Sequence, residues 1–259
     1  MYYYGYFRDS VRSTGFCPQR RRVLRKNNHR QGMRFMSNNL QTDVPQTEGV
    51  LRSDECCSRR YLAAKRALDV VCSFSALVLL GPVILVLALA IFLDDPHGSP
   101  FFSQTRIGLN GRPFRFYKLR SMVCNAEELR QSLQDQNEMD GPAFKIRNDP
   151  RITRIGRFIR RTSLDELPQF WNVLKGDMSM VGPRPPLPAE VASYTPYQRQ
   201  RLTVKPGLTC IWQTMPRRNE LPFRQWVELD LEYIRTRNMR LDLKLIFKTV
   251  GCMFAGEGR

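Results

Sequence analysis

One long apolar run dominates the pattern of hydrophobic and polar positions along this chain. Residues 70–93 carry no charged side chain, and basic residues flank the run on both sides. A straight helix over this run would be about 36 Å long, enough to cross a bilayer core of about 30 Å. We therefore expect three parts: an N-terminal extension (1–58), a membrane helix with its basic flank (59–95), and a cytosolic catalytic domain (96–259).

Gly81 and Pro82 lie in the middle of the apolar run and open a second possibility. Proline lacks a backbone N–H and clashes with the carbonyl group four residues earlier, so it ends or kinks a helix. Each leg of a broken helix would be about 18 Å long, which fits one leaflet. The two flanks carry equal numbers of basic residues, so the positive-inside rule favours neither side. We expect a re-entrant helix with both ends cytosolic, and a spanning helix is the alternative.

Periodicity after the apolar run predicts an α/β body that is mostly helical. Alternating residues at 101–104 and 114–119 surround Asn110-Gly111, which predicts two strands joined by a hairpin turn. Apolar residues at 152–159 recur at helical spacing beside arginines, which predicts an amphipathic helix lying in the membrane interface; a surface helix with a solvated cationic face is the alternative. Further helices are predicted at 127–138, 167–175, after Pro222 and at 241–254, and the proline-rich segment 180–220 is predicted to be largely loop.

The charge balance indicates acidic partners. Lys and Arg number 41 against 24 Asp and Glu, a formal net charge of +17. Such a surface attracts phospholipid headgroups, phosphorylated substrates or nucleic acid. Lys65 and Arg66 directly precede the apolar run, where we expect them to contact anionic membrane lipids. The basic segment 1–58 has no zinc-finger or RNP-like pattern. We expect it to be disordered, and we expect no nucleic-acid partner.

The cysteines give little sign of a metal site. Seven are present, no two have CxxC spacing, and one lies inside the apolar run. This pattern argues against a structural zinc site and favours a reduced, cytosolic setting for the body.

Adjacent carboxylates at Asp165 and Glu166 are the sharpest candidates for chemistry. Pro168 fits only the first turn of a helix, which predicts that both lie at the positive end of a helix dipole. One carboxylate could attack phosphorus while the other holds Mg²⁺ or handles a proton. The alternative is structural, because Ser163 and Glu166 have the spacing of a capping box.

Basic residues elsewhere could meet a phosphate. Arg184 lies between prolines in Gly182-Pro183-Arg184-Pro185-Pro186, and a stiffly held guanidinium can clamp phosphate oxygens through two hydrogen bonds. A rigid turn with a solvated arginine is the alternative. Lys118 and Arg120 alternate on one predicted strand and could add positive charge to the same site, or could lie on a solvated strand face.

From about Lys65 to its C-terminus, the chain resembles the bacterial sugar transferases known as monotopic phosphoglycosyl transferases. The matching segments lie at 65–69, 101–108, 116–122, 149–156, 163–169, 172–185 and 205–209, besides the Pro82-containing apolar run. The resemblance implies a re-entrant membrane helix at the cytosolic face of the inner membrane. It implies Mg²⁺-dependent transfer of sugar-1-phosphate from a UDP-sugar to undecaprenyl phosphate (a polyprenyl phosphate), with release of UMP. This would be the first membrane step of exopolysaccharide or other lipid-linked glycan synthesis.

The same resemblance assigns roles to residues. It implies that Asp165 is the nucleophile that forms a phosphosugar-enzyme intermediate and that Glu166 is linked to Mg²⁺. Lys118, Arg120 and Arg184 would meet phosphate.

The sequence departs from the family pattern where Cys210 replaces a usual Gly, and Gln213-Thr-Met-Pro-Arg217 replaces a common Gln-Val-x-Gly-Arg, so the donor sugar stays open. A catalytically inactive membrane scaffold and a nucleic-acid binder acting through the basic tail are the competing function classes. The sequence does not specify an oligomeric state.

Overall fold

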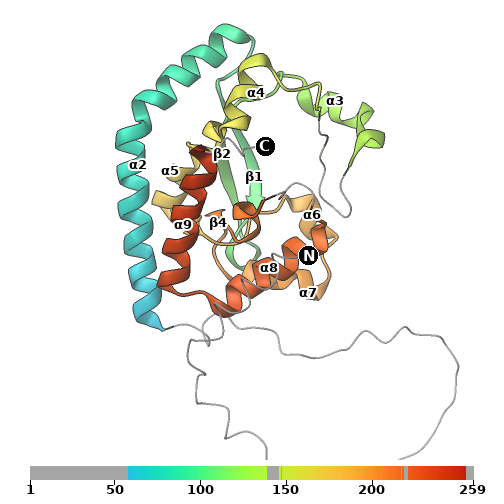
Figure 1. The fold of residues 1–259 in the computed structure, drawn as a ribbon. Helices are drawn as coiled ribbons and strands as arrows, with labels where there is room; N and C mark the ends of the chain where they lie inside the picture. The colour runs from blue at the N-terminus through green and yellow to red at the C-terminus, as the bar shows by residue number, and fades with distance from the viewer. Residues whose placement is uncertain (1–57, 139–145, 147, 217, 219–220, 255–259) are drawn as a thin grey trace, which may run out of the picture. The chain divides into compact units, whose positions relative to one another are not determined.

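The computed structural model describes residues 58–138, 146, 148–216, 218 and 221–254 (Figure 1). The predicted N-terminal extension lies outside these residues, apart from Ser58. The described part is mostly helical with two small sheets, which confirms the predicted class. Its elements are α2 (Arg59–Asp94), β1 (Phe101–Ile107), β2 (Pro113–Leu119), α3 (Ala126–Ser132), α4 (Arg154–Arg161), α5 (Gln169–Lys175), β3 (Ser179–Val181), α6 (Pro188–Ala192), α7 (Pro196–Arg199), β4 (Gly207–Thr209), α8 (Phe223–Thr236) and α9 (Met239–Phe254), with short 3₁₀ turns η1 (Leu109–Gly111), η2 (Gln134–Gln136), η3 (Leu164–Glu166), η4 (Gln200–Thr203) and η5 (Trp212–Thr214).

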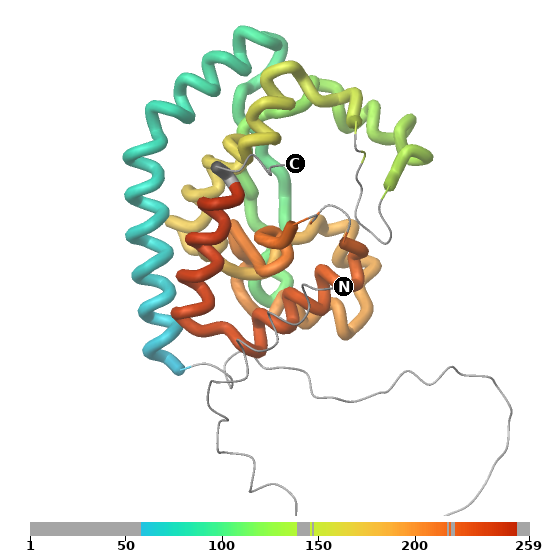
Figure 2. Tube along the Cα trace, in the orientation of Figure 1, coloured from blue at the N-terminus to red at the C-terminus, as the bar shows by residue number. Residues whose placement is uncertain are grey.

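Helix α2 contains the whole apolar run and continues through Pro82. Its axis changes direction in its second half (Figures 1 and 2). Pro82 therefore does not end the helix. Leu79 is 74% exposed, and only 11% of the most apolar stretch of α2 is buried, unlike the core helix of a soluble protein. Length, composition and exposure together suggest membrane association, while the re-entrant topology stays a prediction.

The strands β1 and β2 form the predicted hairpin. They pair antiparallel from Phe101 opposite Leu119 to Ile107 opposite Pro113. Asn110 and Gly111 have φ angles of 54° and 77°, and such left-handed conformations are what a tight hairpin turn requires. The Asn-Gly signal in the sequence is confirmed.

The second sheet was not expected, because it lies partly in the segment predicted to be loop. Strands β3 and β4 pair in parallel, and short helical segments fill much of the rest of residues 180–220. The chain approaches itself closely here: a Cβ atom on Gly207 would lie 2.0 Å from the backbone nitrogen of Gly182. Only glycine fits at that crossing.

The N-terminal end of α2 is bonded to the body through its two basic residues. Lys65 forms an ion pair of 2.9 Å with Asp242 of α9. Arg66 donates to the carbonyl oxygens of Val173 (2.8 Å) and Leu174 (2.7 Å) at the end of α5, where helix carbonyls lack intrahelical partners. Both side chains thus have partners within the protein, a buried carboxylate for Lys65 and the end of α5 for Arg66. Their predicted contact with lipid headgroups stays a prediction.

A third side chain of α2, Asp69, continues this attachment. Its buried carboxylate accepts hydrogen bonds from the Ser179 hydroxyl (3.0 Å) and the Met180 backbone N–H (2.8 Å) of β3. Further along α2, Ile84 and Ile91 pack in an apolar cluster with Leu119, Ile159 and Leu167. This cluster joins α2 to β2, α4 and η3, and so fixes the elements that carry the candidate carboxylates.

Candidate active site

The two adjacent carboxylates lie on η3, a separate turn that precedes α5. Ser163 begins this turn with φ of 58°, and its side chain makes no capping hydrogen bond. Helix α5 starts only at Gln169, after Pro168. Asp165 and Glu166 are therefore not in the first turn of α5, and the capping-box alternative is not observed. The left-handed Ser163 instead reverses the chain between α4 and η3.

Lys118 connects the two carboxylates. Its Nζ atom lies 3.7 Å from Oδ2 of Asp165 and 3.4 Å from Oε1 of Glu166. The side chains of Lys118 and Asp165 are 14% and 9% exposed. The ammonium also lies over the ring of Phe116, 5.6 Å from its centre. Three residues singled out in the sequence, Lys118, Asp165 and Glu166, thus meet where β2 faces η3.

Two arginines that the sequence did not single out interact electrostatically with the carboxylates: Arg106 with Glu166, and Arg160 with both Asp165 and Glu166. Arg184, which the sequence singled out, interacts with both of these arginines. Burial first, and then the positive charge of Arg184, lower the pKa of Arg106 to about 10, although the charges of Glu190 and Glu166 oppose this shift. Burial also lowers the pKa of Arg160, which Asp165 opposes. A site whose cations outnumber its two carboxylates is suited to a bound anion.

The loop that carries Arg184 is held from two sides. The Ile107 N–H donates to the carbonyl of Pro186, and Nη1 of Arg106 donates to that of Pro185, both at 3.0 Å. On the other side, the Gly207 N–H donates to the carbonyl of Pro183 at 2.9 Å. The predicted rigid turn and the predicted phosphate clamp are thus compatible, because the rigid turn holds Arg184 in the cationic group.

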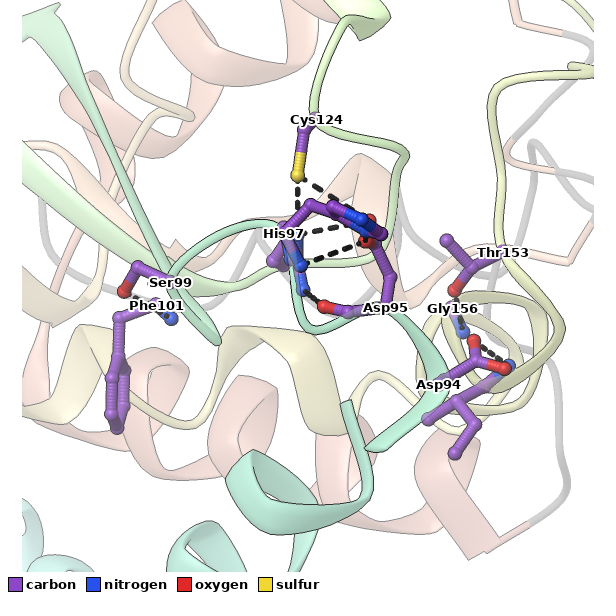
Figure 3. Close-up of polar contacts among 10 residues, drawn as sticks. Asp94, Asp95, His97, Ser99, Phe101, Cys124, Thr153 and Gly156 are labelled. Atoms are coloured by element: carbon purple, nitrogen blue, oxygen red, sulfur yellow. Dashed lines mark hydrogen bonds and ion pairs between the residues drawn. The ribbon is translucent and has the colours of Figure 1, made fainter. Parts of the chain in front are cut away.

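Arg120 lies elsewhere. It follows the last residue of β2, is buried, and donates to Oδ2 of Asp95 at 3.0 Å, to the Asp95 carbonyl, and to Sγ of Cys124 at 2.6 Å. Figure 3 shows Asp95, just beyond the end of α2, joined by dashed lines to His97 and Cys124. The structure therefore does not bring Arg120 to the carboxylates, and its bonds instead tie the end of α2 to the segment after β2.

A pocket opens beside Glu166. Its wall combines apolar, hydroxyl, amide and charged side chains from η3, α5, β4, η5, the segment after η5, and α9. The lining residues are Ser163, Glu166, Leu167, Phe170, Leu208, Thr209, Gln213, Arg218, Thr249 and Cys252.

The donor set fits Mg²⁺ in one respect. Among the described residues no group of three His, Cys, Asp or Glu side chains could hold a metal by itself. Mg²⁺, however, is usually bound by one or two carboxylates together with water and substrate phosphates. Asp165 and Glu166 supply two such carboxylates next to a cationic, anion-suited site.

Arg106 and Arg160 were missed for different reasons. Arg160 counted only as part of the cationic face of a predicted interfacial helix, although it lies five residues before Asp165. Arg106 lies opposite Phe114 in the hairpin, and its position follows only from how the hairpin packs on the rest of the body. Its Nε atom is buried without a hydrogen-bond partner among the described residues.

Comparison with known proteins places these features in a family context. The family model described as bacterial sugar transferase matches residues 60–256. The chain is 47% identical over 198 residues to galactosyl transferase CpsE of Streptococcus agalactiae serotype III, covering 76% of this chain and 44% of that protein. It is 41% identical over 206 residues to the UDP-galactose-lipid carrier transferase of Erwinia amylovora (78% and 42% covered). It is 39% identical over 205 residues to the undecaprenyl-phosphate galactose phosphotransferase of Salmonella typhimurium (78% and 42% covered). The chain spans less than half the length of these relatives.

Proposed function

Because this chain belongs to the bacterial sugar transferase family, we propose that it transfers a sugar-1-phosphate from a UDP-sugar to undecaprenyl phosphate. The names of two relatives supply the donor class and the lipid acceptor. The observation that carries the proposal is that Lys118 lies within 4 Å of both Asp165 and Glu166, while Arg106 and Arg160 interact electrostatically with these carboxylates and Arg184 with both arginines. This arrangement combines a nucleophile with the positive charge that two phosphate groups require.

Asp165 is the nucleophile in this proposal. Its carboxylate oxygen attacks the phosphorus bonded to the sugar, the bond between that phosphorus and the UMP oxygen breaks, and UMP leaves. The sugar-phosphate remains on Asp165 as an acyl phosphate. An oxygen of the lipid phosphate then attacks the same phosphorus, and the bond to Asp165 breaks, which restores the carboxylate. Two displacements thus replace one direct reaction between two anions.

The surrounding cations oppose the repulsion between the carboxylate and the phosphates. The guanidinium groups of Arg106 and Arg160 are shielded from solvent, and Arg184 is carried on a turn that backbone hydrogen bonds hold. All three can stabilise charge that develops on phosphate oxygens. Lys118 keeps the Asp165 carboxylate near them. Glu166 would hold Mg²⁺ together with the substrate phosphates, and the ion would neutralise phosphate charge when bound. Arg120 has no role in this scheme, because it is bonded to Asp95.

The lipid acceptor fits the exposed apolar surface of α2. Undecaprenyl phosphate is confined to a membrane, so an enzyme acting on it must bring its site to the headgroup level. We place the site at the cytosolic face of the inner membrane, with α2 re-entrant and with anionic lipids near the exposed basic residues. The acceptor phosphate would enter the cationic site from that face.

The test is UMP release and mass spectrometry of the intact protein, in detergent with Mg²⁺ and a panel of UDP-sugars. We expect UMP release and a sugar-phosphate adduct before any lipid is added. Asp165→Asn should abolish both signals, and Glu166→Gln should slow them severely. Asp135→Asn, an exposed carboxylate on η2, is the matched control and should behave like the parent. An adduct that persists in Asp165→Asn would assign the nucleophile elsewhere.

A further inference from the structure

We propose that the pocket beside Glu166 is the hexose subsite of the donor, and that Cys210 positions Gln213 in its wall and thereby contributes to the choice of sugar. This inference rests on the proposed function and deepens it. The side chain of Cys210 is within hydrogen-bond distance of Gln213, which lines the pocket.

The backbone around Gln213 is fixed. Trp212 and Thr214 on either side are 3% and 2% exposed. The Trp212 ring stacks on Trp226 of α8 with 4.3 Å between ring centres and 4° between planes, and the Thr214 hydroxyl donates to the Ile211 carbonyl at 2.8 Å. Gln213 is therefore presented to the pocket from a rigid turn.

Cys210 decides how the side-chain amide of Gln213 is oriented. The Cys210 thiol is 1% exposed and donates to Oε1 of Gln213, with 3.1 Å between the two atoms. With Oε1 held by Cys210, the amide NH₂ is the end left for the pocket. Arg218 donates to the Gln213 backbone carbonyl at 2.8 Å and lines the same pocket, so this wall offers hydrogen-bond donors.

The remaining wall offers acceptors. The Thr249 hydroxyl donates to the Leu245 carbonyl at 2.8 Å and lies 2.6 Å from the Thr209 hydroxyl. Because the Thr249 proton is used, Thr209 donates to Thr249 and keeps its lone pairs for the pocket. The Glu166 carboxylate is a second acceptor. Donors and acceptors on different walls match sugar hydroxyls, which both donate and accept.

Proximity to the nucleophile also selects the hexose over the base. In a UDP-sugar, one oxygen joins the hexose to the phosphorus that Asp165 would attack. The uracil is separated from that phosphorus by a second phosphate and a ribose. A pocket whose wall includes Glu166, the neighbour of Asp165, is therefore reached first by the hexose.

A glycine at position 210 would leave the Gln213 amide free to turn. With the Gln213 amide reversed, the pocket would present a hydrogen-bond acceptor in place of a donor. A site that can switch in this way rejects the wrong hexose epimer less strongly, because the hydroxyl of that epimer can still find a partner. The cysteine should thus sharpen the discrimination between donors that differ at one hydroxyl.

The first experiment compares kcat/KM for UDP-galactose and UDP-glucose, which differ only at the C4 hydroxyl. In Cys210→Gly and Cys210→Ala we expect the ratio of the two values to change about tenfold, whereas a purely structural defect would lower both values equally. Cys210→Ser keeps a donor and should restore the parent ratio. Cys72→Ala, outside the pocket, is the control and should leave the ratio unchanged.

The second experiment uses Cys252, which lines the pocket as a free thiol. Iodoacetamide labelling of the full chain, followed by peptide mass spectrometry, should be slowed at Cys252 by UDP-hexoses and not by UMP. Equal protection by UMP would place the nucleotide here and overturn the inference. If Cys210→Gly turns over UDP-sugars with the parent's ratio of kcat/KM values, the inference about Cys210 is wrong and the proposed function still stands. If the parent turns over no UDP-sugar, the proposed function is wrong as well.

Discussion

The ammonium of Lys65 lies 2.9 Å from a carboxylate oxygen of Asp242 and joins α2 to α9. The Asp242 side chain is fully buried, and the hydroxyls of Tyr61 (2.9 Å) and Tyr233 (2.7 Å) donate to its two oxygens. The buried carboxylate is thus stabilised by one ion pair and two hydrogen bonds from side chains of the protein. Lys65 is the cation that forms an ion pair with it.

Removing either partner of this pair should destabilise the fold strongly. Lys65→Met leaves a buried carboxylate without its cation, and breaking a buried pair from one side costs about 3–5 kcal/mol. Chemical unfolding in detergent measures the loss. Lys175→Met removes an ion pair whose side chains are partly exposed and should cost less than about 1 kcal/mol. Equal losses in the two variants would show that Lys65 acts as an ordinary surface charge.

Arg184 should bind phosphate through two parallel hydrogen bonds from its planar guanidinium, and not through its charge alone. Lysine keeps the charge but loses the paired hydrogen bonds. We expect Arg184→Lys to lower kcat/KM at least about tenfold, about 1.4 kcal/mol of transition-state stabilisation. Arg224→Lys, a change at an exposed arginine of α8, is the control. Parent-like kinetics in Arg184→Lys would reduce Arg184 to a structural residue of the turn.

Ser163 should be a strained position. Its φ of 58° is unfavourable for any residue with a Cβ atom. Ser163→Gly should therefore maintain or raise the free energy of unfolding, by up to about 1 kcal/mol, and Ser163→Val should lower it by about 2 kcal/mol. The same pair of changes at Ser193, whose φ is −91°, should show no gain for glycine. The thermal unfolding midpoints of the four variants test this prediction, and a lower midpoint for Ser163→Gly than for the parent would contradict it.

The Asp149–Arg151 pair should make stability depend on pH in the acid range. Burial acts to raise the pKa of Asp149, but the hydrogen bonds and charge of Arg151 outweigh it and hold the pKa below 3.8. The contribution of this pair is therefore complete above the unfolded-state pKa and is lost as the pH falls through the lower folded-state value.

Asp149→Asn should accordingly lower the free energy of unfolding by about 1.5–3 kcal/mol at pH 7. The gap between parent and variant should be constant from pH 7 to about pH 5 and should shrink below about pH 4. Denaturant titrations at several pH values measure it. A gap that widens as the solution becomes more acidic would contradict the assignment.

Pro82 should favour a re-entrant path for α2. In intact cells, cysteines introduced at Ser58 and Ser99 in an otherwise cysteine-free chain should both resist a membrane-impermeant thiol reagent. Pro82→Leu removes the kink and restores a backbone donor, and it should shift position 99 towards external labelling. External labelling at position 99 with Pro82 intact would show that the helix spans the membrane.

Local signals predicted those elements whose cause is local. The Asn110-Gly111 turn and the end of α5 at Gly176, whose φ is 94°, each depend on the conformational limits of one or two residues. The apolar periodicity of α8 and α9 is also local. These elements formed close to where the sequence placed them.

Other features depend on partners far away in the chain, and no local pattern encodes them. Strands β3 and β4 have three residues each and form because Gly182 and Gly207 let two backbones meet. Arg66 also bonds the end of α5, a contact that its place beside the apolar run does not reveal. Arg120 and Lys118 looked equivalent by alternation, but Arg120 lies beyond the last strand residue and turns to Asp95 instead.

The attachment of α2 through Lys65, Arg66 and Asp69 bears on how the protein is made. The ribosome delivers α2 before the body that depends on it, so the apolar helix can enter the lipid while its partners are still being synthesised. A truncated chain that begins after α2 would leave the Asp242 carboxylate without its cation and the last carbonyls of α5 without their donor. We expect such a fragment to be prone to aggregation and proteolysis. The body should therefore fold stably only in a chain that also carries α2.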